Sequence, residues 1–228
     1  MSTRTKSKAA RPANLTDQIY ERLKQEIFDF RLLPGDRFTE SEVAWRMCAS
    51  RTPVREALTR LRRDGFVEVL FRSGWKVKPF DFGQLGQFYD VRIVLELAAV
   101  ERLCAMEQPP DLTDLKEQWL VPASGRETDG PAVCALDEQF HHRLVEATGN
   151  AEMARIHHEV SERIRVVRRL DFTKSRRIEA TYNEHAQILR AVLRRRRDDA
   201  RPLLRAHIEA SKSEVMKITV HMLEEARR

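Results

Sequence analysis

Apolar residues recur every three or four positions through most of this 228-residue chain, the spacing of one face of an α-helix. The first three such stretches cover residues 15–30, 39–47 and 52–64. Gly65 ends the third, and the apolar runs 66–70 and 75–78 around a Ser-Gly turn are typical of a β-hairpin. Three helices followed by a hairpin predict a winged helix-turn-helix.

Residues at the starts of these three helices are typical of helix caps. Thr16 is a candidate N-cap for the first, and Thr39 with Glu42 can form a reciprocal capping box at the second. Thr52 followed by Pro53 indicates an N-cap and a first helical position for the third. The four residues between the second and third helices predict a tight turn.

Beyond Pro79 the pattern stays helical and no strand pattern returns. The predicted helices cover residues 85–104, 112–120, 132–148, 151–170, 175–196 and 199–225, with a Pro/Gly/Ser-containing break at 121–131. Pro202 is expected in the first turn of the last helix, where a missing N–H is tolerated. The fold class is therefore mainly α, with a winged helix-turn-helix over 15–78 and an all-α bundle of six or seven helices over 79–228.

Composition and charge narrow the class of protein. Charged residues make up 33% and hydrophobic residues 42%, with only 8 Gly and 9 Pro, which argues against low complexity or wholesale disorder. No apolar run approaches the ~18 residues of a membrane span, and the polar start lacks a signal-peptide core. We therefore expect a cytoplasmic protein. The three cysteines form no C-x-x-C pair, so neither a disulfide framework nor a cysteine zinc site is indicated.

The net charge of +6 is unevenly distributed. Residues 1–78 carry 17 basic and 10 acidic groups, whereas 79–228 carry 24 and 25. The first 14 residues form a basic tail, which we expect to be flexible and which serves either a polyanion or merely solvation. The excess positive charge thus belongs to the first third of the chain, which includes the tail.

The third helix presents polar residues at its N-terminal end, the end with which a recognition helix reaches base edges in the major groove. Arg51 and Arg55 are candidate base readers, because a guanidinium can grip guanine O6 and N7 together. Ser50 and Thr52 suit phosphate oxygens, and Arg72 lies in the predicted wing tip, in or near a minor groove. Alternatively, these are the arginines of an ordinary surface helix.

Polar residues also face the predicted core of the helical domain. Asp137 and His141 lie four residues apart on the apolar side of their helix, and His185 and His207 lie on the inward arcs of two later helices. A buried carboxylate needs a partner, and a divalent cation neutralises it while using neutral imidazole nitrogens. A shared metal site is one interpretation. Separate histidines, each hydrogen-bonded to its own core partner, are the other.

The N-terminal motifs resemble the winged-helix signature of GntR-family transcriptional regulators. The similar strings are Pro34-Gly-Asp-Arg-Phe38, Glu40-Ser-Glu-Val-Ala44 and Ser50-Arg-Thr-Pro-Val-Arg-Glu-Ala-Leu58. This resemblance implies that Arg51 and Arg55 contact operator bases and that Ser50, Thr52 and the wing residue Gly74 lie at the DNA. Some members have an arginine where this chain has Ser41, so their operator sequences cannot be transferred.

The C-terminal motifs are similar to the FCD-type ligand-sensing domain of the FadR-like branch of that family. They are Leu136-Asp-x-x-Phe-His141, Gly149-Asn150, Glu184-His185 and His207-Ile208. The resemblance implies a divalent ion, usually zinc, nickel or manganese, held by Asp137, His141, His185 and His207. It also implies that Arg92 lines an effector pocket. Its alternative role is a salt bridge with Glu96.

The predicted function is sequence-specific transcriptional regulation by a homodimer that binds double-stranded operator DNA. A small organic acid is the expected effector, with Arg92 and Tyr182 as candidate effector-binding residues. We predict no catalytic residues. The alternatives are a metal-dependent hydrolase-like enzyme with a nucleic-acid-targeting module, and an architectural DNA-binding protein without a ligand.

Overall fold

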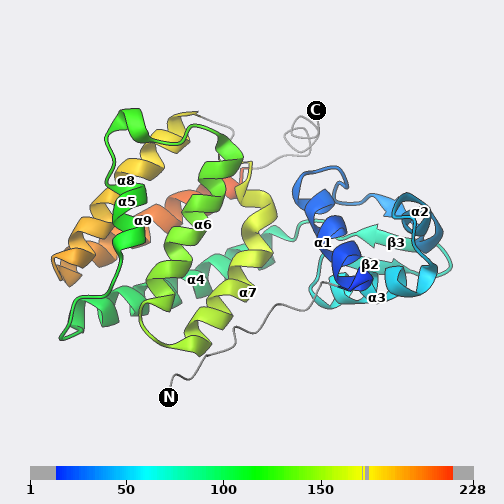
Figure 1. Ribbon diagram of the computed structural model, residues 1–228, viewed down its shortest axis with the longest axis horizontal. Helices are drawn as coiled ribbons and strands as arrows, with labels where there is room; N and C mark the ends of the chain where they lie inside the picture. Colours follow the sequence, from blue (N-terminus) through cyan, green and yellow to red (C-terminus); the bar gives the residue numbers. More distant parts are fainter. Residues whose placement is uncertain (1–13, 171, 173–174, 218–228) are drawn as a thin grey trace, which may run out of the picture. The chain divides into compact units, whose positions relative to one another are not determined.

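The structure, a computed structural model, describes residues 14–170, 172 and 175–217. The chain divides into two compact units, with the boundary after Pro79, and each is described by itself (Figure 1). The predicted basic tail, apart from its last residue, and the predicted end of the last helix lie outside the described residues.

The first helix, α1 (Leu15–Phe28), begins at a different cap from the predicted one. Asn14 is the N-cap, and its side-chain oxygen accepts a hydrogen bond from the Asp17 backbone N–H at 2.8 Å. Thr16 lies inside the first turn, so its predicted capping role was wrong. The helix also ends earlier than predicted, because Phe30 adopts a left-handed backbone conformation with φ of 57°.

The predicted capping box is present at α2 (Glu40–Arg46). The Thr39 hydroxyl accepts a hydrogen bond from the Glu42 N–H at 3.2 Å, and the Glu42 carboxylate accepts one from the Thr39 N–H at 2.6 Å. Two of the backbone donors at the start of α2 are thereby satisfied, which fixes where this short helix begins.

The third helix, α3 (Arg51–Arg63), begins two residues before Pro53, the predicted first helical residue. Ser50 is therefore the N-cap residue and Thr52 is not. Pro53 still lies in the first turn, where its missing N–H breaks no helical hydrogen bond. The apolar side of α3 contributes Val54, Ala57, Leu58 and Leu61 to the core of this unit.

The predicted hairpin consists of β2 (Val67–Leu70) and β3 (Gly74–Val77), which pair antiparallel. A third strand, β1 (Arg37–Phe38), was not predicted because two residues are too short to show a pattern. The order is β1-β3-β2, so β3 is central. Gly74 has φ of 86°, and a Cβ there would lie 2.6 Å from the Phe38 carbonyl oxygen. Glycine thus lets β1 and β3 approach closely.

The second unit confirms the predicted all-α class, with six α-helices among its described residues. They are α4 (Phe82–Ala105), α5 (Thr113–Trp119), α6 (Gly130–Glu146), α7 (Ala151–Arg168), α8 (Ser175–Leu193) and α9 (Arg197–Val215). A short 3₁₀ turn, Ala123–Gly125, lies within the predicted break. Pro202 is inside α9 rather than in its first turn, because α9 begins earlier than predicted.

The long helix α4 packs against α6, α7 and α9, and α8 packs against α9, α6 and α5. The inward sides of α4, α6, α8 and α9 therefore meet in one core, and the polar side chains on those sides lie within it (Figure 1). Within the described part of the chain, none of the helices combines the length and apolar character that crossing a bilayer requires.

Candidate metal centre and DNA-reading helix

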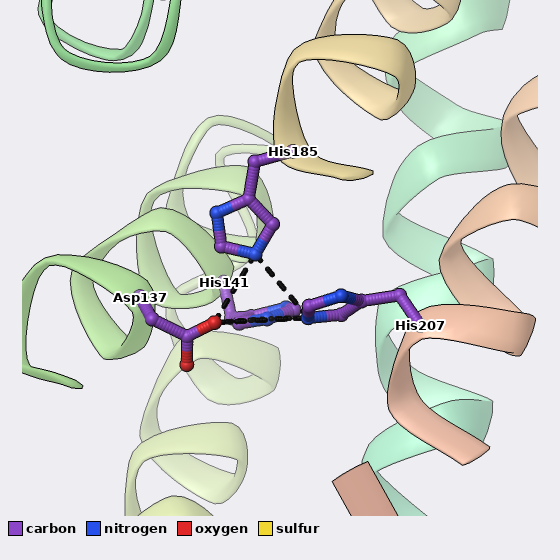
Figure 2. A group of neighbouring side chains, drawn as sticks. All are labelled: Asp137, His141, His185 and His207. Atoms are coloured by element: carbon purple, nitrogen blue, oxygen red, sulfur yellow. Dashed lines mark hydrogen bonds and ion pairs between the residues drawn. The ribbon is translucent and has the colours of Figure 1, made fainter. Parts of the chain in front are cut away.

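Four side chains from three helices converge in the core of the helical unit. Asp137 and His141 project from α6, His185 from α8 and His207 from α9 (Figure 2). All four are buried, and one ligand atom from each lies within 4.8 Å of those of the other three. These are the four ligands expected from the sequence, and the structure brings all of them together.

The ligand atoms face one another at close range. His185 Nε2 lies 3.2 Å from Asp137 Oδ1 and 3.2 Å from His207 Nε2. His141 Nε2 lies 3.1 Å from His207 Nε2. Phe140 stacks on the His185 ring, with centroids 3.8 Å apart and an interplanar angle of 11°. Packing therefore fixes the direction in which His185 presents Nε2.

Two carboxylates outside the cluster orient its imidazoles. His141 Nδ1 lies 2.5 Å from Glu96 Oε2, and His207 Nδ1 lies 2.6 Å from Glu184 Oε2. An ionised carboxylate only accepts hydrogen bonds, so each Nδ1 carries the proton in the neutral ring. Each Nε2 then presents a lone pair to the centre, which is the arrangement found around protein-bound metal ions.

The charge states of the histidines agree with this assignment. Burial is the main cause that lowers the pKa of His207 to about 3, and burial also lowers the pKa values of His141 and His185. Burial by itself would raise the pKa of Glu96, but Arg92 and His141 hold that pKa well below its ordinary value. The core therefore contains neutral imidazoles and an ionised carboxylate at neutral pH.

The oxygens of Asp137 complete the set of donors. Arg168 forms an ion pair with Oδ2, whereas Oδ1 faces the imidazoles and accepts no hydrogen bond from the described residues. The lone pairs of His141 Nε2 and His207 Nε2 meet at 3.1 Å without a proton between them, so they repel each other unless a cation lies among them. Three imidazole nitrogens and one carboxylate oxygen are also a donor set that divalent transition metals prefer. The residues present therefore fit such an ion.

Sequence reasoning missed four residues around this cluster. Glu184 and Arg168 contact the candidate ligands directly, and His157 Nε2 lies 3.0 Å from Glu96 Oε1. Glu96 was noted only as a partner of Arg92. The position of Glu184 directly before His185 was the one available signal for these roles.

The two candidate effector residues differ in their surroundings. Arg92 Nε donates to Glu96 Oε1 at 2.5 Å, so the salt bridge considered as its alternative role is present. Its Nη1 and Nη2 atoms are buried and have no hydrogen-bond partner among the described residues. The Tyr182 hydroxyl accepts hydrogen bonds from the Glu127 N–H at 3.0 Å and from the Gln118 side chain at 3.3 Å. Its ring packs on Trp119.

The candidate base readers lie on the surface of the first unit. The side chains of Arg51 and Arg55 are each 63% exposed, and both contact Glu40, the first residue of α2. Ser50 and Thr52 are exposed beside them. In the turn between β2 and β3, the exposed Arg72 lies over the Phe71 ring, 5.1 Å from its centroid.

The chain matches two family models. Residues 15–77 match the gntR family of bacterial regulatory proteins, and residues 87–210 match the FCD domain. The Nta operon transcriptional regulator of Aminobacter aminovorans is 31% identical over 83% of this chain and 89% of its own. The uncharacterized HTH-type transcriptional regulator YdhC of Bacillus subtilis is 29% identical over 83% and 86%.

A solved structure shows the same fold. The crystal structure of a GntR protein from Rhodococcus sp. RHA1 superimposes with a TM-score of 0.74 and 23% identity, and the match covers 90% of this chain and 98% of that one. The gntR family is described as bacterial regulatory proteins, and the Aminobacter relative is described as a transcriptional regulator and not as an enzyme.

Proposed function

The chain belongs to the GntR family of bacterial regulatory proteins and carries an FCD domain, and from this premise we propose how it is controlled. It is a DNA-binding transcriptional regulator. In our proposal a small carboxylate binds beside a divalent cation in the helical unit and changes the affinity of the winged helix for operator DNA. Such a regulator meets its operator in the bacterial cytoplasm. The gntR family and the Aminobacter regulator give the hydrolase alternative no support.

The convergence of Asp137 Oδ1 with three imidazole Nε2 atoms is the observation that carries this proposal. These four residues would hold zinc, nickel or manganese, and Glu96 and Glu184 would fix the tautomers of His141 and His207. When bound, the ion supplies a positive centre that attracts an anionic ligand. The protein supplies the orientation of the donors and a core from which water is excluded.

Arg92 supports a carboxylate as the effector. Its Nε atom is bonded to Glu96, and its two terminal nitrogens are buried without partners among the described residues. A buried guanidinium edge without an acceptor favours an anion that accepts both of its N–H groups. We propose that Tyr182 contacts the effector through its ring, because its hydroxyl is already bonded to other residues.

The winged helix supports operator recognition by α3. Arg51 and Arg55 are exposed at the N-terminal end of this helix, with Ser50 and Thr52 placed for phosphates and Arg72 and Gly74 in the wing. We propose that a homodimer presents two such helices to a palindromic operator, because two-fold symmetry in the protein requires two half-sites in the DNA.

Elemental analysis of the purified full-length chain tests the metal centre. We expect about one equivalent of a divalent transition metal per chain, and loss of that metal in His185→Ala. His158→Ala is the matched control, because His158 is exposed on α7 and lies outside the cluster. Absence of bound metal after reconstitution with zinc, nickel and manganese in turn would contradict the proposal.

A second measurement tests the effector and the DNA readers. Small mono- and dicarboxylates should raise the melting temperature of the metal-loaded chain, and this shift should disappear in Arg92→Met. In gel shifts with DNA selected by the wild-type chain, Arg51→Ala and Arg55→Ala should each lose at least about tenfold in affinity. Unchanged binding in both variants would contradict the assignment of the base readers.

A further inference from the structure

Glu40 contacts both candidate base readers, although it carries the charge that DNA repels. It is the first residue of α2, and its side chain is 13% exposed. Arg51 and Arg55, from the start of α3, converge on its carboxylate. A carboxylate that contacts both candidate base readers is unexpected on a surface whose partner is a polyanion.

The contact with Arg55 is a side-on pair of hydrogen bonds. Arg55 Nε donates to Glu40 Oε1 at 3.0 Å, and Arg55 Nη2 donates to Glu40 Oε2 at 2.8 Å. Arg51 Nη2 donates to the same Oε2 atom at 3.3 Å. The hydrogen bonds from Arg55 are the main cause that lowers the pKa of Glu40, so this carboxylate is ionised at neutral pH.

This geometry leaves one useful edge of Arg55 for DNA. Glu40 occupies the edge formed by Nε and Nη2, and the terminal edge formed by Nη1 and Nη2 remains available. Two parallel N–H groups of a guanidinium match O6 and N7 of guanine. A side chain already held in one orientation loses less conformational freedom when it makes that contact.

The charge of Glu40 acts on contacts with the DNA phosphates. Binding without sequence preference comes from attraction between basic side chains and phosphates. A carboxylate between two arginines cancels part of that attraction and repels a phosphate that approaches them. It therefore weakens binding to DNA of any sequence more than it weakens a bidentate contact with a base edge.

We propose that Glu40 is a specificity-determining residue, which orients Arg51 and Arg55 toward base edges and suppresses their binding to DNA without the operator. This inference rests on the proposed role of these two arginines as base readers. Glu40 acts through them and is a positioning residue. Its two effects, orientation and charge, can be separated by substitution.

The test uses the full-length chain and two duplexes, one selected from a random library by the wild-type protein and one with the same bases scrambled. We expect Glu40→Gln to bind the scrambled duplex several-fold more tightly and the selected duplex more weakly. The affinity ratio, that is, affinity for the selected duplex divided by affinity for the scrambled one, should therefore fall about tenfold or more. The salt dependence on scrambled DNA should steepen by about one released counterion.

Glu40→Asp separates the two effects, because it keeps the charge on a side chain one methylene shorter. We expect weaker binding to the selected duplex with little change on the scrambled one. Glu21→Gln, at an exposed site on α1, is the control for net charge and should leave the affinity ratio within about twofold of wild type. Circular dichroism establishes that each variant is folded, and Glu40→Asp alone carries the test should Glu40→Gln unfold.

Two results would overturn the inference. One is an affinity ratio within twofold of wild type in the folded Glu40 variants. The other is a fall of the affinity ratio in Glu21→Gln that equals the fall in the Glu40 variants. Loss of selected-duplex binding in Arg51→Ala and Arg55→Ala, measured alongside, shows whether the base readers themselves are correctly assigned. Failure of that measurement would remove the proposed function of the arginines, whereas failure of the Glu40 variants alone would remove only this inference.

Discussion

Glu96 Oε2 lies 2.5 Å from Nδ1 of His141, deep between α4 and α6. The other oxygen of the same carboxylate lies 2.5 Å from Arg92 Nε and 3.0 Å from His157 Nε2. One buried side chain therefore joins a candidate metal ligand to the candidate effector arginine. A carboxylate in this position fixes the tautomer and the orientation of a metal-binding imidazole, and its loss lowers the affinity for the metal.

Glu96→Gln is expected to weaken metal binding about 10- to 100-fold, because the amide is a poorer partner for the His141 N–H. It should also lower the free energy of unfolding by about 3–5 kcal/mol, since Arg92 is left buried without a counter-charge. Competition with a chelator of known affinity measures the first effect, and urea denaturation measures the second. Glu101→Gln, a half-buried position on α4 that is paired with Arg201, is the control. Equal metal affinities in the two variants would contradict this role for Glu96.

Chelation of the metal is expected to lower the melting temperature of the full chain. A ligand that binds only the folded state stabilises it by about 3 kcal/mol when its free concentration is ~100 times its Kd. Differential scanning calorimetry with and without EDTA measures this loss. His185→Ala should melt at the same temperature in both conditions, because it lacks one of the four donors. A shift of equal size in that variant would show that EDTA acts elsewhere.

Periodicity predicted the helices and the inward positions of Asp137 and His141, because burial of one helix face requires apolar residues at fixed spacing. It also placed His185 and His207 inward. Their convergence depends on how α6, α8 and α9 pack, which spacing within one helix does not determine. The role of Glu184 as a partner of His207 was harder to predict, since its side chain is 34% exposed and resembles any surface residue of α8.

The contacts of Glu40 illustrate the same limit. Glu40 and Arg55 are 15 residues apart and on different helices, so no helical spacing relates them. The tight turn between α2 and α3 brings them together, and the exact start of α3 decides which side chains face Glu40. The sequence placed the N-cap two residues late, at Thr52 instead of Ser50, because Thr52 before Pro53 is a stronger capping signal than Ser50, which makes no side-chain cap bond.

Gly74→Ala is expected to destabilise the winged helix more than Gly35→Ala does. Both glycines have positive φ, 86° and 94°, so alanine costs about 1–2 kcal/mol at either position. Only at Gly74 does the added Cβ also meet the Phe38 carbonyl oxygen, at 2.6 Å, whereas the space around Gly35 is open. Urea denaturation of the two variants measures the difference. Equal losses of stability would show that β1 can move away from β3 at little cost.

Asp137 and Arg168 form an ion pair in the core that should be costly to break from one side only. In protein from which metal has been removed, Asp137→Asn should lower the free energy of unfolding by about 3–5 kcal/mol, because Arg168 stays buried with its charge uncompensated. Arg168→Met fills a similar volume without charge, so the double variant should recover much of that loss. Urea denaturation of the two single variants and the double variant measures the coupling between the side chains. Additive losses would show that Arg168 finds another acceptor, and the double variant should still lack metal because the carboxylate donor is gone.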